Sequence, residues 1–79
     1  MKVIITEHAR RRLETRCYIS VEEARARAEK AARRGIKGRV ALTGTFPHLV
    51  VDIRRETAVV VTALWPGMRI RKVKAFLPV

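Results

Sequence analysis

The sequence predicts one α+β domain, residues 1–79, in which two helices pack on one face of an antiparallel sheet. Three observations lead to this fold class. Apolar residues recur with helical spacing in the first half, and they alternate at every second position after Gly38. Residues suited to helix caps and turns separate the segments. With 48% hydrophobic residues, the chain is expected to fold rather than to remain disordered.

The first half is expected to hold a short strand and two helices. Lys2–Thr6 is rich in β-branched residues, and Thr6 can cap a helix that ends near Cys17. Ser20 can cap a second helix, Val21–Arg34. The apolar positions of this helix are mostly small, which allows close packing: Val21, Ala24, Ala28, Ala31 and Ala32. Because Glu23 and Arg27 are spaced as an i,i+4 ion pair, its other face is expected to be solvated.

The second half is expected to form three or four strands joined by hairpins, which gives the order β-α-α-β-β-β(-β). Apolar residues alternate around Val40 and from residue 49 to 53, and Thr57–Trp65 is apolar on both faces, as a central strand would be. Trp65 is expected in the core, the alternative being a base-stacking residue. In Met68–Phe76 the alternation breaks near Arg71 and Lys72. We expect a strand with a bulge there, with a helical end as the alternative.

The net charge of +11, from 18 Lys and Arg against 7 Asp and Glu, favours nucleic acid or an acidic protein as the partner. A membrane partner is not expected, because no lipid-facing amphipathic segment accompanies the charge. Cys17 is the single cysteine, so no internal disulfide can form, and no Cys/His cluster suggests a metal or cofactor. Without a signal core or a membrane-spanning run, we expect a cytoplasmic protein. The alternative is that the arginines only solubilise it.

One row of the first helix combines an imidazole with two guanidiniums. At helical spacing, His8, Arg12 and Arg16 lie beside the apolar stripe formed by Ala9 and Leu13. Histidine titrates near neutral pH and arginine binds phosphate through two nitrogens, so this row could act in general acid–base cleavage of RNA. The alternative is that His8 hydrogen-bonds the sheet and the two arginines are solvated.

A second set of cations is expected on the sheet face opposite the helices. These residues would contact a nucleic-acid backbone independently of sequence: Arg39, Arg54, Arg69, Arg71 and Lys72. His48 follows Pro47 and is expected in a hairpin loop. Exposed sheet faces commonly carry charges, so plain solvation of these cations is the alternative.

The helix motif and the element order resemble the RelE/ParE-like toxin superfamily, small basic proteins of bacteria, plasmids and phages. His8-Ala9-x-x-Arg12-Leu13-x-x-Arg16, followed by Ile19-Ser20-x-Glu22-Glu23, is similar to an uncharacterised branch with an N-terminal His-Ala-x-x-Arg helix. That branch also has a Val-Thr pair like Val61-Thr62 at the end of a later strand. Cys17-Tyr18 replaces a single glycine of the branch, which lengthens the turn between the helices by one residue.

The resemblance implies a RelE-like fold and a toxin that either cleaves mRNA on the ribosome without metal or acts on another target. It also implies RNA or the ribosome as a partner and an acidic antitoxin as inhibitor. Family members use arginines and lysines to stabilise the phosphate charge while a Tyr, His or Glu transfers protons. This chain has no tyrosine after Tyr18, so His8 or His48 would have to serve instead. The alternative function is a non-catalytic phage or bacterial protein that binds nucleic acid or a host protein.

Overall fold

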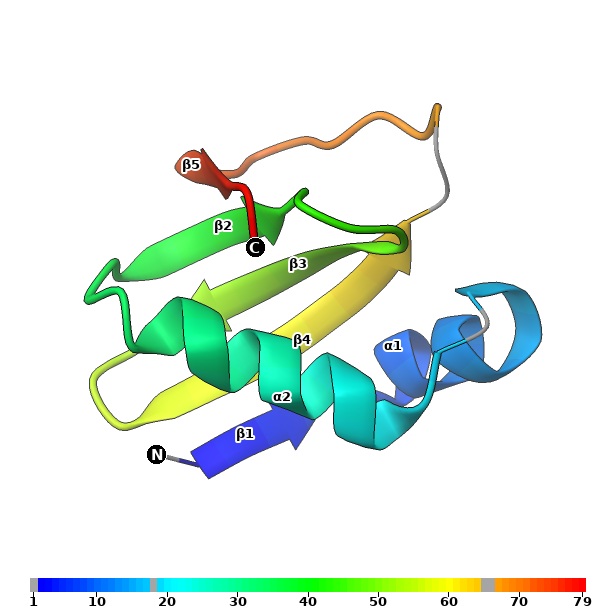
Figure 1. Ribbon diagram of the computed structural model, residues 1–79, viewed down its shortest axis with the longest axis horizontal. Coiled ribbons are helices and arrows are strands. Elements are labelled where there is room, and N and C mark those ends of the chain that lie inside the picture. The colour runs from blue at the N-terminus through cyan, green and yellow to red at the C-terminus, as the bar shows by residue number, and fades with distance from the viewer. Residues whose placement is uncertain (1, 18, 65–66) are drawn as a thin grey trace.

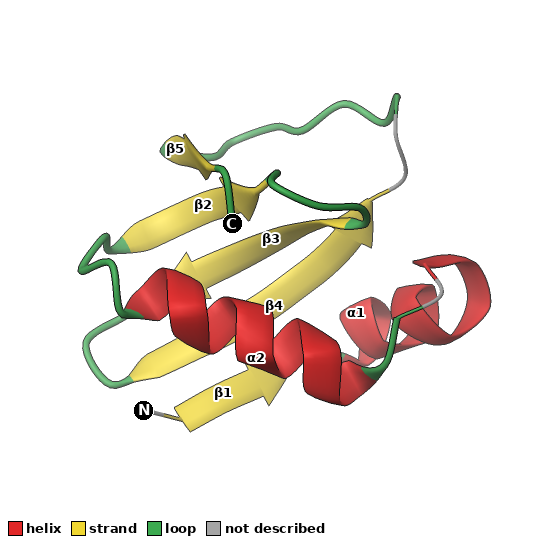
Figure 2. Ribbon diagram, viewed as in Figure 1, coloured by secondary structure: helices red, strands yellow, loops and turns green. Residues whose placement is uncertain are grey.

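The computed structural model describes residues 2–17, 19–64 and 67–79, without the side chains of Arg16 and Cys17. Trp65, expected in the core, therefore lies outside the described residues. The described chain forms a five-stranded sheet with two helices (Figure 1 and Figure 2). Its elements are β1 (Lys2–Ile5), α1 (Glu7–Arg12), the π-helical turn η1 (Leu13–Cys17), α2 (Val21–Ala32), β2 (Gly38–Leu42), β3 (His48–Ile53), β4 (Thr57–Leu64) and β5 (Ala75–Leu77). The predicted α+β class is confirmed.

The sheet is mixed, and the expectation of an antiparallel sheet was wrong. Its strand order is β1-β4-β3-β2-β5, in which β1 runs parallel to β4 and β5 runs parallel to β2. The pairs β2–β3 and β3–β4 are antiparallel. Short turns force neighbouring strands to be antiparallel, but long connections leave both directions open. Since β1 reaches β4, and β5 reaches β2, only through long intervening segments, the alternation of apolar residues could not indicate their direction.

The predicted helix caps are confirmed. The Thr6 hydroxyl oxygen accepts a hydrogen bond from the Ala9 N–H at 3.1 Å, and it donates to the Val61 carbonyl of β4 at 3.0 Å. Ser20 accepts from the Glu23 N–H at 3.1 Å, so α2 begins where predicted. Each cap satisfies an N–H that the first helical turn leaves unpaired. The Thr6 hydroxyl also ties the start of α1 to β4, which lies between β1 and the central strand β3.

The core lies between the helices and one face of the sheet. Ala24, Ala28 and Ala31 of α2 are completely buried, and their small side chains let the helix backbone approach the strands closely. Ala9 and Leu13 join the same core from the first helix. The strands contribute Val3, Val40, Leu42, Leu49, Val51, Ile53, Ala58, Val60, Ala63 and Leu77.

A bulge in β4 changes which of its apolar residues face the helices. Val51 pairs with Val60 and Val50 pairs with Thr62, so Val61 has no opposite residue. One extra residue reverses the alternation of side chains from that point on. Val60 and Ala63 therefore both face the helices.

We call the sheet face opposite the helices the open face. One row across it consists of Arg39, Asp52, Val59 and Ile4, which are successive partners on β2, β3, β4 and β1. The next row runs through Phe76, Ala41, Val50 and Thr62. In the described part of the chain, the open face is thus apolar around β1 and β4 and carries charge around β2.

Arg27 of α2 turns into the protein, so the expectation of a solvated face was wrong for this residue. Its Nη1 donates to the Pro47 carbonyl at 2.5 Å, and its Nη2 to the carbonyls of Val79, Thr45 and Leu42 at 3.0, 3.3 and 3.4 Å. An exposed i,i+4 ion pair contributes about 0.2–0.5 kcal/mol. Hydrogen bonds from a charged group contribute about 1.5–3 kcal/mol, which favours the inward position.

Burial lowers the pKa of the Arg27 guanidinium, and the nearby Glu23 carboxylate raises it. Arginine keeps its proton in proteins, so the group acts as a permanent donor at this site. It connects three parts of the chain: α2, the β2–β3 loop and the C-terminal residues that follow β5. We call this connection the Arg27 clamp.

Backbone contacts add to the Arg27 clamp. The Thr43 N–H donates to the Leu77 carbonyl at 2.8 Å, and the Gly44 N–H donates to the Val79 carbonyl at 3.2 Å. A Cβ atom on Gly44 would lie 2.5 Å from the carbonyl carbon of Pro78, so no side chain fits there. The residues after β5 therefore lie directly against the β2–β3 loop.

Replacing Arg27 by Met should reduce the free energy of unfolding by about 2–3 kcal/mol, because buried carbonyls lose their donor. Urea unfolding followed by circular dichroism measures this change. Lys30→Met is the matched control on the exposed side of α2 and should stay within about 0.5 kcal/mol of the wild type. Equal stability of the two variants would show that the clamp does not stabilise the fold.

Gly44→Ala should detach the residues after β5 from the loop, because its methyl group would collide with backbone atoms. We expect a loss of roughly 1–3 kcal/mol, typical of overpacking. Amide hydrogen exchange should show faster exchange of the Thr43 N–H, whose acceptor is in β5. Thr45→Ala, at an exposed neighbouring position, serves as the control. Unchanged protection at Thr43 would contradict the prediction.

Candidate nucleic-acid interface

The row predicted on the first helix is only partly assembled among the described side chains. His8 is exposed in the first turn of α1, and Arg12, one turn later, is half-buried. The Arg16 side chain lies outside the described residues. Arg12 Nη1 lies 3.6 Å from Met68 Sδ, which brings this end of α1 next to the segment that follows β4. Arg11, rather than Arg12, approaches an acid: its Nε lies 3.5 Å from Glu7 Oε1.

His48 is the first residue of β3, so the expectation that it lies in the loop was wrong. It pairs with Leu64 and alternates with the buried Leu49, which places it on the open face. The cis peptide between Phe46 and Pro47 belongs to the turn immediately before it. His48 is half-buried and therefore remains partly accessible from the open face.

Arg39 and Arg54 are the two predicted binding residues associated with the central strands. Arg39 is exposed on the open face, directly opposite Asp52. Arg54 follows β3, and its Nη2 lies 3.4 Å from Asp52 Oδ2, whose side chain is 22% exposed. Arg54 therefore has a carboxylate beside it, which reduces its attraction for phosphate.

The remaining predicted binding residues do not lie on a strand. Residues 67–74 follow an irregular path, so the expected strand forms only at Ala75–Leu77. Lys72 has a left-handed backbone (φ 57°), and the sequence pattern also breaks at this position. We call residues 67–74 the basic segment, because four of its side chains are exposed cations: Arg69, Arg71, Lys72 and Lys74.

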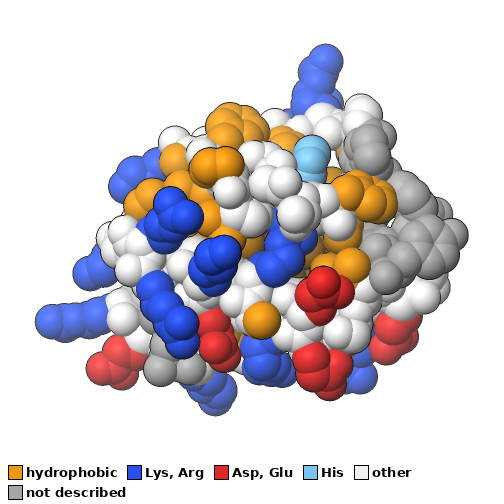
Figure 3. Space-filling view, viewed as in Figure 1, with side chains coloured by type: hydrophobic (Ala, Val, Ile, Leu, Met, Phe, Trp, Pro, Cys, Tyr) orange, Lys and Arg blue, Asp and Glu red, His pale blue; other side chains and the backbone are white. Residues whose placement is uncertain are grey.

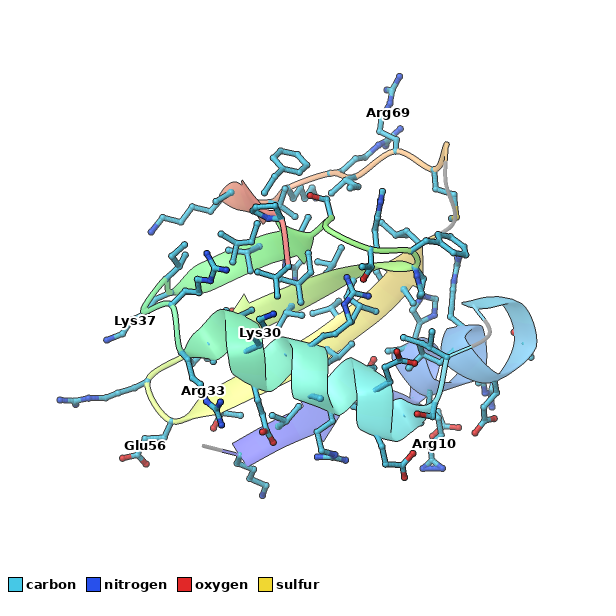
Figure 4. The ribbon with its side chains drawn as sticks, viewed as in Figure 1. Arg10, Lys30, Arg33, Lys37, Glu56 and Arg69 are labelled. Carbon is cyan, nitrogen blue, oxygen red and sulfur yellow. The ribbon has the colours of Figure 1, made fainter. Side chains whose placement is uncertain are left out.

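The basic segment is attached to the sheet beside Arg39. The Lys74 N–H donates to the Arg39 carbonyl at 2.6 Å, which continues the pairing of β5 with β2. Arg39 and the four cations of the segment thus form one basic strip along this edge. Lys74 was missed by the sequence interpretation, although the run Arg69-x-Arg71-Lys72-x-Lys74 signals it. Figure 4 shows Arg69 extending away from the rest of the protein.

A second group of cations lies around the end of α2. Lys30, Arg33 and Lys37 are exposed there (Figure 4). In the space-filling view, Lys and Arg side chains gather over this end, with Asp and Glu side chains among them (Figure 3). Cations near a helix C-terminus are favoured by the helix dipole, so this group has a structural explanation. The basic strip does not lie at the C-terminus of a helix, so the helix dipole does not explain its cations.

Phe76 is an aromatic residue that the sequence interpretation missed. It lies on β5 next to the basic strip, pairs with Ala41 on the open face and is 59% exposed. Its neighbours Ala75 and Leu77 face the core instead. The sequence did contain a signal for this exposed position. On a strand, a phenylalanine between two core residues points to the opposite face.

Within the described ranges, no three His, Cys, Asp or Glu side chains come together as metal ligands. None of the described helices has the length and apolar character needed to cross a membrane. Comparisons with protein-family models, curated proteins and solved structures found no match to this chain.

Proposed function

We propose that this chain is a RelE-like RNA-binding protein that contacts the RNA backbone through the basic strip. The observation that carries this proposal is the arrangement of Arg39 with the cations of the basic segment, all exposed along one edge. Residues 57–79 contain no Asp or Glu. The positive potential of the basic segment is therefore not neutralised by acids from its own part of the chain, and phosphate is the complementary ligand.

The irregular conformation of the basic segment also suits phosphate binding. Its cations are exposed, whereas Ile70 and Val73 between them are half-buried, so the backbone is held while the charges point outward. Because the backbone of this segment is already fixed, it does not have to become ordered when a ligand binds. This lowers the entropy cost of binding. The specific choice of RNA, or of a ribosomal site, follows from the resemblance to RelE-like toxins. An acidic antitoxin would compete for the same strip.

The double variant Arg69→Gln/Arg71→Gln should bind a single-stranded RNA oligonucleotide more weakly than the wild type. Each lost phosphate contact should reduce the slope of log affinity against log salt by about 1, and so by about 2 in total. Fluorescence anisotropy titrations at several salt concentrations measure this slope.

Arg10→Gln/Lys30→Gln is the matched control, because it removes the same charge from exposed positions on the helices. It should leave the slope nearly unchanged. If both variants lose the same amount, the overall charge rather than the strip determines binding. If the wild-type protein shows no salt-dependent RNA binding, the proposed function is wrong.

Metal-independent cleavage of mRNA is a second candidate function. The observation in its favour is the contact between Arg12 and Met68, which brings the His8 helix next to the basic segment. In such a reaction the ribose 2′-oxygen attacks the neighbouring phosphorus and the 5′-oxygen leaves. His8 would take up or supply the proton, and Arg12 would stabilise the charge on the phosphate.

His8→Ala should then abolish cleavage of mRNA on translating ribosomes in the presence of a metal chelator, while RNA binding remains within about twofold of the wild type. His48→Ala is the matched histidine variant and should retain cleavage. Gel analysis of the RNA fragments provides the measurement. Cleavage that persists in His8→Ala and disappears in His48→Ala would assign proton transfer to the open face instead.

A further inference from the structure

We propose that Phe76 is a stacking platform for an unpaired base, which makes single-stranded RNA the substrate class of the open face. This inference rests on the proposed RNA-binding function. The ring is 59% exposed, compared with 41% for Phe46 and 40% for Ile4, the other exposed large hydrophobic residues of the described chain. Such an exposed phenyl ring gains free energy when another apolar or aromatic surface covers it.

The residues around Phe76 leave the ring accessible. Its partner on β2 is Ala41, which is small, so no large side chain projects from that strand position, although Ala41 itself is completely covered by its surroundings. Val50 and Thr62 continue the row at lower exposure. Phe76 therefore stands on the edge strand and is the most exposed residue of its row on the open face.

The cations of the basic strip lie at the distance that a nucleotide requires. Arg39 is two residues before Ala41 on β2, and strand geometry puts its Cα roughly 8 Å from that of Phe76. Lys74 is two residues before Phe76, and its N–H is bonded to the Arg39 carbonyl. A base stacked on the ring would thus have its phosphates within reach of both side chains.

This combination is specific for single strands. Proteins that bind single-stranded nucleic acid join aromatic side chains, on which bases stack, to cations that contact the backbone. In a duplex both faces of each base are covered by the neighbouring base pairs, so the ring could not stack. A second copy of this chain is a poorer occupant, because each copy carries a net charge of +11 and would bring a further Arg39 and Lys74 to the same face.

The test compares the affinity of Phe76 variants for a single-stranded RNA oligonucleotide and for the same sequence as a duplex, at one salt concentration. Phe76→Ala should weaken single-strand binding roughly 5- to 100-fold, corresponding to one stacked base, and leave duplex binding unchanged. Phe76→Trp should retain binding. Phe76→Leu, which is apolar without an aromatic face, should lose most of it. Ile4→Ala, an exposed apolar residue of the same face on β1, is the matched control and should bind normally.

Three results would overturn the inference while leaving the proposed function intact. One is unchanged single-strand affinity of Phe76→Ala in a wild-type background that binds RNA with steep salt dependence. Another is wild-type affinity of Phe76→Leu. The third result, measured by light scattering, is a wild-type dimer that the Phe76→Leu substitution dissociates. It would assign the ring to self-association. Thermal unfolding of each variant checks that the fold is retained, as expected at an exposed position.

Discussion

The fold depends on the hydrogen bonds that Arg27 donates from α2 to the carbonyls of the β2–β3 loop and of Val79. β5 has only three residues and pairs with one strand, which is too little to hold a sheet edge by itself. The Arg27 clamp fixes the residues after β5, and β5 in turn fixes the end of the basic segment. The half-buried guanidinium of Arg27 therefore helps to position the exposed cations and Phe76.

The alanines of α2 make the Arg27 clamp possible. Because Ala24, Ala28 and Ala31 are small, the helix axis lies close to the sheet, and a side chain from the margin of that helix face can reach the loop carbonyls. A helix with leucines at these positions would stand farther away, and the guanidinium would fall short. The close packing of α2 and the inward position of Arg27 thus both follow from the small residues on this helix.

Most of the elements could be predicted from the sequence because their signals are local. Thr6 and Ser20 mark the helix starts through hydrogen bonds to residues three positions away, alternation marks β2 and β3, and a continuous apolar run marks β4. The direction of β1, the inward turn of Arg27 and the path of residues 67–74 depend on contacts between distant segments, so local patterns could not predict them. For the same reason, the predicted cations were identified as residue types, but their grouping into the basic strip required the structure.

The acidic residues are unevenly distributed along the chain, and this makes the electrostatic potential near the basic segment more positive. Of the seven acids, five lie on α1, η1 and α2, and the other two are Asp52 on β3, opposite Arg39, and Glu56 in the turn after it, whereas the basic segment and β5 contain none. A polyanion approaching this chain is therefore drawn preferentially toward the edge formed by β2 and β5. In the proposed RNA complex, the attraction of the basic strip for phosphate would act over longer distances than the stacking of a base on Phe76, which requires direct contact.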